Sequence, residues 1–571
     1  MIRTKFANFV ILAIFSILIF GLINLEIVGK TKYKALSDKN SLRLLPQMGA
    51  RGRIYDRNGE IILDNSLSYD VMVMPQDLKE VDKTLIGISK VLGQDLEDLK
   101  DAFRRSYVSS SLPVVLADNI GFKKAMALEE SKLNFPGIII RPSPKRIYPH
   151  KRLAVHLLGY LNEIDRWRLT KLADYGYKTK DIVGFGGIEE RYDYYLRQEE
   201  GGLSFEVDHR GRSRRVLGFR SAVNGKDLQL TLDLRIQKIV EDKLKERTGC
   251  VIIMDPYFGE ILAMASYPNF DPEIFMDKKN ASIANFLKDP DAPMVNRAIS
   301  GVYPPGSLFK IVVATAALET KKINLFTSFF CNGSMHIGGQ EFNCWSIHNQ
   351  QTLVPAISHS CNIFFYNTGI LTGAQTIHDY AIKFGLSKTT NFELSYESSG
   401  FIPSPLWRQI NKFKKWYKGD TANLSIGQGD CLVTPLQMAR MIAVFANKGY
   451  LVTPYIIKSI GGKVISVNQR KKINLSLKES TINNIREGLR KAISDPGGTG
   501  FVLSNLSIPV AGKTGTAQAP PGQAHAWFVG FFPYDNPKYV ISVFLERGGP
   551  GYVSCVLAKQ IIEEMIVAGL I

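Results

Sequence analysis

Several features that define small specialised proteins are missing from this sequence. It has six cysteines in 571 residues, too few for the dense disulfide framework of a small secreted domain. It contains no internal repeats and no low-complexity tracts. It also lacks a compact basic-aromatic motif, a zinc knuckle and a helix-turn-helix signal. We therefore expect no nucleic-acid partner, although the formal net charge is +18.

The sequence also has only one long apolar run. Residues 6–25 are apolar except for two asparagines, a serine and a glycine, and about 20 such residues can span a bilayer as a helix. No small-x-small cleavage site follows, so the sequence favours an uncleaved signal anchor over a cleaved signal peptide. Basic residues flank both ends of the apolar run, so the positive-inside rule does not decide the orientation of the helix in the membrane. Residues after about 30 are expected on one side of the membrane.

The length is too great for a single hydrophobic core, so about two to four domains are expected. Hydrophobic residues make up 45% of the chain and charged residues 22%, as in globular proteins. A turn at residues 225–227 marks the predicted boundary between two large parts. In the first part, Asn58-Gly59 between β-prone runs predicts a hairpin, and residues 81–105 predict helices.

The second part has the pattern of an α+β domain. Strand, helix and hairpin signals follow one another over residues 228–266, and strands return at residues 526–532 and 539–545. The sequence between them, over residues 305–450, favours helices. We therefore expect an antiparallel sheet that is built from both ends of this part and flanked by helices.

Ser307 stands at the start of a predicted helix, because two prolines and a glycine precede it. Lys310 follows three residues later and lies on the same helical face. A lysine with a lowered pKa could take the proton of this serine, and the helix N-terminus supplies N–H groups beside its oxygen. A chain of this composition should contain about two Ser-x-x-Lys sequences by chance, and an ordinary serine-capped helix is the alternative.

Two more short motifs follow Ser307. Ser360-Cys361-Asn362 offers a hydroxyl for proton relay and an amide for a substrate carbonyl, with a helix cap as the alternative. Lys513-Thr514-Gly515-Thr516 offers a positive charge, two hydroxyls and backbone groups for an extended peptide, with an ordinary edge strand as the alternative. The order and spacing of the three motifs are hard to obtain by chance.

Two cysteines are interleaved with histidines. Cys331, His336, Cys344 and His348 have the spacing Cys-x4-His-x7-Cys-x3-His. A loop disulfide between Cys331 and Cys344 is one interpretation if this part is extracytoplasmic. Zinc binding is the second, although the spacing matches structural zinc sites only loosely, and two unpaired buried thiols are the third. We assign no metal and no cofactor from the sequence, and these four residues are the candidate ligands.

The three motifs together are those of the penicillin-recognising serine enzymes. The chain further resembles the pedestal of class B penicillin-binding proteins at residues 51–63, 146–161, 184–202 and 225–237. It resembles penicillin-binding protein 2, the cell-elongation transpeptidase, more than the division enzyme at residues 295–307, 416–420, 425–429 and 525–533. No class A glycosyltransferase domain is seen. The cysteine/histidine loop and Cys361 depart from the family pattern.

The resemblance implies an α+β protein with an N-terminal transmembrane helix. A mostly-β pedestal with a small α/β head would precede a penicillin-binding, β-lactamase-like transpeptidase domain. The implied divisions are a cytoplasmic tail at 1–5, the transmembrane anchor at 6–25, a linker at 26–49, the pedestal at 50–225 with its head at about 66–145, and the transpeptidase domain at 226–571.

The resemblance also implies the roles of individual residues in a D,D-transpeptidase. Ser307 would be the nucleophile and Lys310 its base, while Ser360 would relay a proton. Asn362 would hold the donor amide, and Lys513 would keep the surroundings of Ser360 cationic. The terminal carboxylate would bind at Thr514 and Thr516 beside Gly515, and the backbone N–H groups of Ser307 and Thr516 would form the oxyanion hole.

The implied substrates and inhibitors are peptidoglycan stem peptides and β-lactams. The implied location is the cytoplasmic (inner) membrane, with the catalytic domain in the periplasm. The implied partners are a polytopic peptidoglycan glycosyltransferase (RodA-like) and a rod-shape scaffold protein (MreC-like). The alternatives are a penicillin-binding sensor or scaffold without turnover, a β-lactamase and a division-type transpeptidase.

Overall fold

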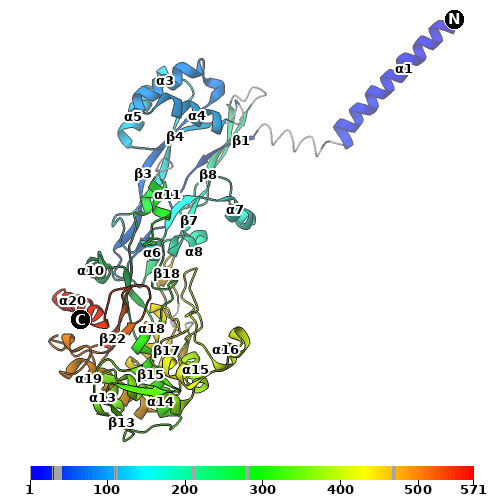
Figure 1. The fold of residues 1–571 in the computed structure, drawn as a ribbon. Coiled ribbons are helices and arrows are strands. Elements are labelled where there is room, and N and C mark those ends of the chain that lie inside the picture. Colours follow the sequence, from blue (N-terminus) through cyan, green and yellow to red (C-terminus); the bar gives the residue numbers. More distant parts are fainter. Residues whose placement is uncertain are drawn as a thin grey trace. The chain divides into compact units, whose positions relative to one another are not determined.

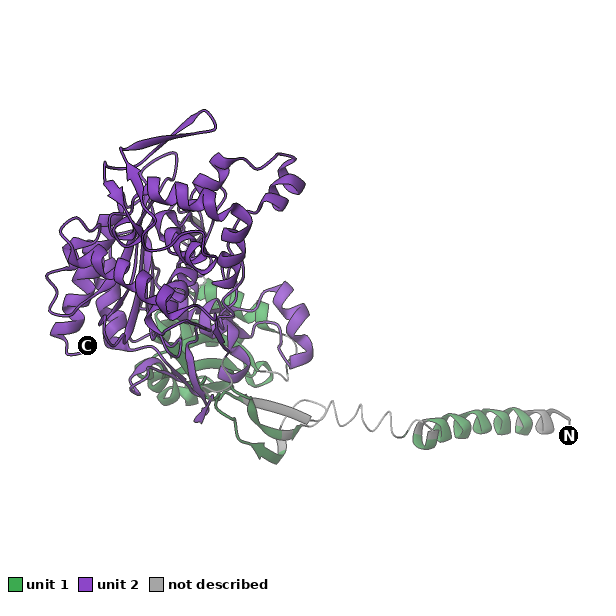
Figure 2. Ribbon diagram, turned by 90° about the horizontal axis from the view of Figure 1, so that it is seen from below, with its two compact units in different colours: residues 1–52, 65–147, 197–226 green, residues 53–64, 148–196, 227–571 purple. Residues whose placement is uncertain are grey.

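The protein is represented by a computed structural model that describes residues 2–28, 30, 42–107, 110, 113–207, 213–276, 282–465 and 471–571 (Figure 1). The chain forms two compact units. Unit 1 comprises residues 1–52, 65–147 and 197–226, and unit 2 comprises residues 53–64, 148–196 and 227–571 (Figure 2).

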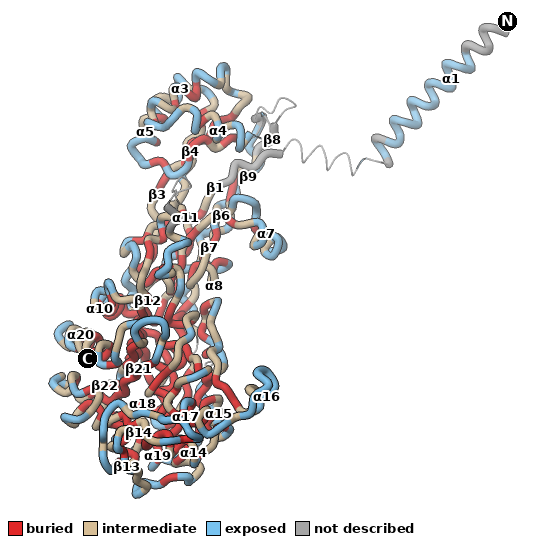
Figure 3. Tube along the Cα trace, viewed as in Figure 1, coloured by how far each residue is buried: buried red, intermediate tan, exposed pale blue. Residues whose placement is uncertain are grey.

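The N-terminal helix α1 (Ile2–Ile23) covers most of the apolar run for which the sequence predicts a membrane span. Its large apolar side chains from Phe9 to Ile23 are exposed (Figure 3). Within the part of the chain that the structure describes, no helix combines the length and the apolarity needed to cross a membrane.

Unit 1 contains a sheet and a small α/β head. The antiparallel sheet has the order β1 (Leu42–Gln47), β8 (Gly201–Val207), β9 (Ser213–Arg220). In the head, residues 69–73 of β3 (Ile61–Val73) pair with β4 (Val114–Ile120), and β3 also pairs with β5 (Ile138–Ile147). Helices α3 (Val81–Leu92), α4 (Leu96–Ser106) and α5 (Phe122–Glu130) bury apolar side chains against these strands. The helices predicted over residues 81–105 are confirmed.

Unit 2 is built on a five-stranded antiparallel sheet, and its strands come from both ends of the unit, as predicted. Their order is β12 (Ile261–Tyr267), β11 (Gly249–Met254), β23 (Tyr539–Leu545), β22 (His525–Phe532), β21 (Ala511–Ala517). Because successive side chains on a strand point to opposite faces, β11 is buried on both. Val251 and Ile253 belong to one apolar cluster, whereas Ile252 and Met254 belong to another.

Helices cover both faces of this sheet. The cluster that contains Val251 includes residues of α10 (Leu234–Leu244) and α20 (Gly551–Val567). The cluster that contains Ile252 includes residues of α12 (Lys310–Glu319), α14 (Asn362–Thr372), α15 (Ala374–Lys383) and α18 (Pro435–Ala446). The α+β interpretation of this part is therefore confirmed.

The remaining elements of unit 2 surround this core. The helices are α6 (Val155–Leu158), α7 (Arg166–Leu172), α8 (Gly187–Arg191), α9 (Asp193–Leu196), α11 (Ser282–Leu287), α13 (Leu353–Ser358), α16 (Pro405–Lys412), α17 (Lys418–Ser425) and α19 (Glu479–Ser494). The strands are β2 (Ile54–Tyr55), β6 (Tyr160–Glu163), β7 (Ile182–Phe185), β10 (Leu228–Leu230), β13 (Phe329–Cys331), β14 (Ser334–Ile337), β15 (Gln340–Asn343), β16 (Asn349–Gln351), β17 (Tyr450–Val452), β18 (Ile457–Ile460), β19 (Lys463–Val464) and β20 (Lys472–Asn474).

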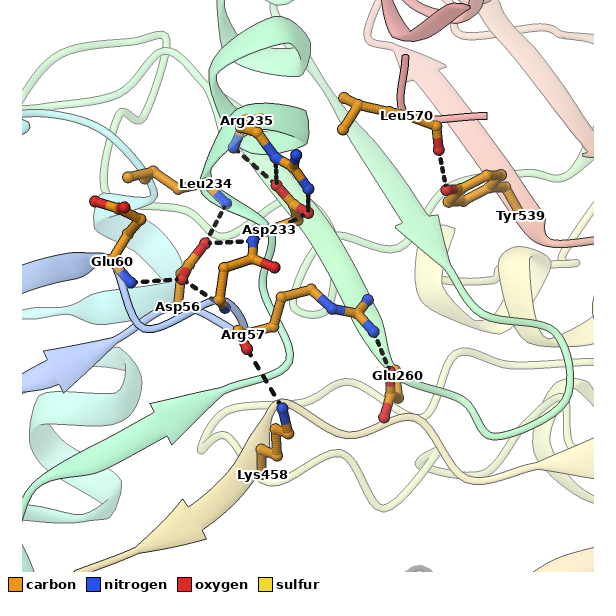
Figure 4. Close-up of polar contacts among 11 residues, drawn as sticks. Asp56, Arg57, Glu60, Asp233, Leu234, Arg235, Glu260, Lys458, Tyr539 and Leu570 are labelled. Atoms are coloured by element: carbon orange, nitrogen blue, oxygen red, sulfur yellow. Dashed lines mark hydrogen bonds and ion pairs between the residues drawn. The ribbon is translucent and has the colours of Figure 1, made fainter. Parts of the chain in front are cut away.

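The hairpin predicted at Asn58-Gly59 is present between β2 and β3, and a buried carboxylate holds it in unit 2 (Figure 4). Asp56 is fully buried. It accepts hydrogen bonds from the backbone N–H groups of Asn58 at 2.7 Å, Glu60 at 2.9 Å and Leu234 at 3.2 Å. Next to it, Asp233 caps the N-terminus of α10 and pairs with Arg235 at 2.7 Å. The hairpin is thus tied to the first helix of the long C-terminal segment.

We predict that Asp56→Ala destabilises unit 2 by about 3 kcal/mol, because it leaves the buried N–H of Leu234 and the partly buried N–H groups of Asn58 and Glu60 without an acceptor. Urea unfolding of the full chain measures this loss. Glu60→Ala in the same turn is the matched control, since its side chain is exposed. Equal unfolding midpoints for the two variants would contradict this role of Asp56.

Candidate functional site

The segment that precedes Ser307 is fixed by backbone contacts. Gly306 has φ +55°, and its N–H donates to the carbonyl of Gly427 at 3.1 Å. A Cβ atom at Gly306 would lie 2.7 Å from the carbonyl oxygen of Thr516 on β21, so only glycine fits this close approach. The indole of Trp527 on β22 donates to the carbonyl of Pro304 at 3.0 Å. These contacts place Ser307 beside the end of strand β21.

Ser307 lies in a 3-10 turn, Gly306–Phe309, that leads into α12 at Lys310. The helix start predicted at or next to the serine is confirmed. Ser307 itself is partly exposed. No hydrogen bond to its hydroxyl is formed by any residue that the structure describes, so its oxygen is open to an incoming ligand.

The side-chain amine of Lys310 is the centre of the site. The side chain is fully buried, and its Nζ lies 2.7 Å from the carbonyl oxygen of Ser360, 3.2 Å from Ser360 Oγ and 2.7 Å from Asn362 Oδ1. A neutral amine has two N–H groups and one lone pair. The two short contacts use both N–H groups, and the lone pair is left for the third neighbour, the Ser360 hydroxyl at 3.2 Å. No hydrogen bond joins Lys310 to Ser307 among the described residues, so proton transfer between them stays a prediction.

Burial lowers the pKa of Lys310 to about 8. The physical cause is desolvation, which disfavours the charged form of the amine. A substantial neutral fraction is therefore present near neutral pH, as a general base requires. The structure thus supplies the condition that the Ser-x-x-Lys motif alone leaves open.

Ser360 and Asn362 meet Lys310 at a strained turn. Ser360 has φ +54°, a conformation that non-glycine residues rarely adopt and that is common at functional sites. It is buried between α13 and α14, and Asn362 is the first residue of α14. The Asn362 side chain also donates to the carbonyl of Asn343 at 3.1 Å, which fixes the orientation of its amide.

Strand β21 carries the third motif and lies at one edge of the five-stranded sheet. Lys513 is fully buried, and burial and the nearby Lys310 lower its pKa well below the ordinary value. Its Nζ donates to the carbonyl of Thr514 at 3.2 Å. The structure gives no contact between Lys513 and Ser360 among the described residues, so the expected cationic influence on Ser360 stays a prediction.

The other three residues of this motif have distinct surroundings. A Cβ atom at Gly515 would lie 3.1 Å from both the Leu308 side chain and the Pro305 carbonyl, so the strand passes close to the Ser307 turn. The hydroxyl of Thr516 accepts a hydrogen bond from the N–H of Gly551 at 2.9 Å. The hydroxyl of Thr514 donates to that of Thr499 at 2.8 Å.

Thr499 was not singled out in the sequence. Its N–H donates to the carbonyl of Ser358 at 3.3 Å, so it links β21 to the turn that carries Ser360. The only local signal is the glycine-rich stretch 497–500, which predicts a turn and no role in a site.

A second cluster of polar side chains lies next to Asn362. The possible ligand atoms of Cys331, Cys344, His348 and Cys361 all lie within 4.8 Å of one another. His348 Nδ1 is 3.5 Å from the sulfurs of Cys331 and Cys344. For zinc–sulfur bonds of about 2.3 Å, the ligand atoms of a tetrahedral site are about 3.8 Å apart. Three thiols and one imidazole therefore fit a structural zinc site.

This cluster changes the sequence interpretation in two ways. His336 is not part of it, because β14 pairs with β15 and leaves the His336 side chain exposed. Cys361 of the second motif takes its place. All six cysteines are free, so no disulfide joins Cys331 to Cys344.

The cluster is connected directly to the site around Lys310. The backbone N–H of Asn362 donates to the sulfur of Cys344 at 3.2 Å. Hydrogen bonds from Cys361 and from backbone N–H groups lower the pKa of Cys344 to about 4. The pKa of Cys361 is raised, since it shares its proton with that thiolate.

Two family models match the chain. The penicillin binding protein transpeptidase domain matches residues 249–566, and the penicillin-binding protein dimerisation domain matches residues 46–230. The chain belongs to the penicillin-binding proteins. Curated relatives narrow this to the class B, penicillin-binding protein 2 type, as the resemblance predicted.

Two of these relatives are named peptidoglycan D,D-transpeptidase MrdA. The protein of Acinetobacter baumannii is 32% identical over 94% of this chain and 84% of its own length. The protein of Escherichia coli strain K12 is 32% identical over 97% of this chain and 92% of its own length. This penicillin-binding protein is therefore a transpeptidase of the cell-elongation type.

Solved structures agree with this assignment. Penicillin-binding protein 2 in its complex with MreC from Helicobacter pylori superposes with a TM-score of 0.84 at 26% identity, over 93% of this chain and 99% of that one. A chain of a peptidoglycan synthase complex that coordinates polymerisation and cross-linking gives a TM-score of 0.74 at 29% identity, over 98% of this chain and 97% of that one. The two-domain fold of pedestal and transpeptidase domain is thereby confirmed.

We predict that the rate of covalent reaction with benzylpenicillin rises with pH. The neutral form of Lys310 increases as pH passes its pKa of about 8, so the rate should increase about tenfold between pH 7 and pH 9. Stopped-flow measurement of acylation at saturating penicillin tests this. Circular dichroism at each pH controls for unfolding. A flat profile, or a rate that falls with pH, would contradict a basic role for Lys310.

Proposed function

We propose that this chain cross-links peptidoglycan stem peptides through a Ser307 acyl-enzyme during lateral wall elongation and rod-shape maintenance. The observation that carries the proposal is the buried Lys310 amine. It lies within 3.2 Å of the Ser360 hydroxyl and 2.7 Å of the Asn362 amide oxygen, one helical turn from Ser307.

In the first step, Lys310 accepts the proton of Ser307, and the serine oxygen attacks the carbonyl between two terminal D-alanines. The N–H groups of Ser307 and Thr516 stabilise the oxyanion. Such donors typically contribute about 3 kcal/mol each. The Thr516 backbone lies close to Gly306, the residue before Ser307, which supports an oxyanion hole formed by the N–H groups of Ser307 and Thr516.

The leaving D-alanine then takes a proton through Ser360, whose hydroxyl lies against Lys310. Asn362 holds the donor amide, Thr514 and Thr516 beside Gly515 bind the terminal carboxylate, and Lys513 keeps the surroundings of Ser360 cationic. The amine of a neighbouring stem peptide attacks the acyl-enzyme, releases Ser307 and forms the cross-link. β-Lactams acylate the same serine because they imitate the two D-alanines.

We also propose the cellular setting. The exposed apolar side chains of α1 support a cytoplasmic-membrane anchor within residues 6–25, with residues 50–225 as pedestal and 226–571 as a periplasmic catalytic domain. The similarity to a complex with MreC supports a rod-shape scaffold partner. The similarity to a peptidoglycan synthase complex supports a polytopic glycosyltransferase partner.

Ser307→Ala should abolish covalent labelling by a fluorescent penicillin, whereas Ser504→Ala, outside all three motifs, should label like the wild type. Gel fluorescence of the purified full chain measures both. Persistent labelling of Ser307→Ala would exclude Ser307 as the nucleophile. Acyl-enzyme lifetimes separate the alternatives, because hours are expected of a transpeptidase and sub-second turnover of a β-lactamase.

We further propose that Cys331, Cys344, His348 and Cys361 hold a structural zinc ion. Bound zinc would supply no reaction step; it would fix the loop over residues 331–348 to the N-terminus of α14, beside Asn362. The chemistry and spacing of the four ligand atoms support this.

Elemental analysis of the full chain should find about one zinc per chain. Cys361→Ser should lose most of the metal and unfold at a lower temperature. Cys431→Ser is the matched control, because Cys431 is equally buried but outside the cluster. A metal-free wild type, or a Cys361→Ser variant that keeps its full zinc content, would rule the site out.

A further inference from the structure

Helix α16 and the residues that follow it carry an unusually exposed apolar surface. We call Leu406, Ile410, Phe413 and Tyr417 the α16 face; their exposed fractions are 62%, 59%, 90% and 64%. Leu406 and Ile410 are four residues apart and so lie on one side of α16. Phe413 is the residue directly after the helix, and Tyr417 directly precedes α17. Figure 3 shows α16 as an exposed element at the surface of unit 2.

The opposite side of this segment is firmly packed. Arg408 pairs with Asp420 at 2.6 Å, and the Trp416 indole donates to the Thr421 hydroxyl at 2.8 Å. The ring of Trp407 packs against Phe401 with a centroid distance of 4.6 Å. Phe413 has φ +53°, which bulky residues rarely adopt away from functional sites. The α16 face is therefore a supported surface and not a loose loop.

Positive charge surrounds the α16 face. Lys414, Lys415 and Lys418 are exposed, and none of them has an ion-pair partner among the described residues. Lys412 is different, because it pairs with Asp430 at 2.7 Å. An exposed apolar surface with uncompensated lysines fits a polymer that offers both apolar faces and carboxylates.

Short contacts connect the segment after the α16 face with residues beside the catalytic site. A Cβ atom at Gly419, two residues after Tyr417, would lie 3.2 Å from the ring of Phe342 on β15. The next residue of β15, Asn343, accepts the hydrogen bond from the Asn362 side chain. Beyond α17, the carbonyl of Gly427 accepts the N–H of Gly306, the residue before Ser307.

We propose that the α16 face binds an uncross-linked peptidoglycan strand and presents its stem peptides to Ser307. Apolar faces of the sugar rings would pack on Phe413 and Tyr417, while the lysines would pair with stem-peptide carboxylates. The inference rests on the proposed function, because that function makes this polyanion the substrate.

Two double variants of the full chain test the proposal, with binding to soluble uncross-linked peptidoglycan strands as the readout. Ile410→Ser/Phe413→Ser should weaken binding at least about tenfold. Lys414→Glu/Lys415→Glu should do the same, and its effect should shrink as salt is raised. Lys463→Glu/Val464→Ser is the matched control: it changes an exposed lysine and a 70% exposed apolar residue elsewhere in unit 2, and should bind like the wild type.

Acylation by penicillin should be unchanged in all three double variants, since none alters a residue of the catalytic site. Wild-type strand affinity in both α16 variants, with normal acylation, would overturn the inference and leave the proposed function intact. Loss of binding only to phosphatidylglycerol vesicles, and not to the strands, would also overturn it. A wild type that penicillin does not acylate would instead contradict the proposed function.

Discussion

The site depends on burying one amine among oxygen atoms. Lys310, the first residue of α12, is fully buried, and its Nζ lies near two oxygens of Ser360 and one of Asn362. Desolvation lowers its pKa toward neutrality, and the two short hydrogen bonds orient the group while its lone pair stays available. An exposed lysine at the same position would remain charged near pH 7 and could not act as a base.

The surrounding fold holds the Lys310 amine in place. The Ser360 turn is held in an unfavourable conformation between two helices. Strand β21 passes so near the Ser307 turn that Gly306 leaves no room for a side chain and Gly515 leaves little. The sheet under these segments joins strands from both ends of unit 2. Asp56 and Asp233 tie the first hairpin to α10, so distant parts of the chain stabilise one small region.

Much of this arrangement could be predicted from the sequence. Three short motifs in a set order predict that Ser307, Lys310, Ser360, Asn362 and Lys513 belong to one site, and the strong local signals of the hairpins and terminal strands predict the sheet. Contacts that depend on tertiary packing could not be predicted from the sequence. Cys361 lies in the same cluster as Cys331 only because β13 and the start of α14 come together. His336 lies outside the cluster because β14 pairs with β15. Thr499 has no local signal that connects it with Thr514.

In the proposed function, the Ser307 acyl-enzyme is resolved by an amine and not by water. The direct measurement is mass spectrometry of the products formed by the purified full chain from stem peptides that end in two D-alanines. The account predicts one released D-alanine for each cross-linked dimer. Release of D-alanine with only shortened, uncross-linked peptide would contradict it, because the enzyme would then be a hydrolase.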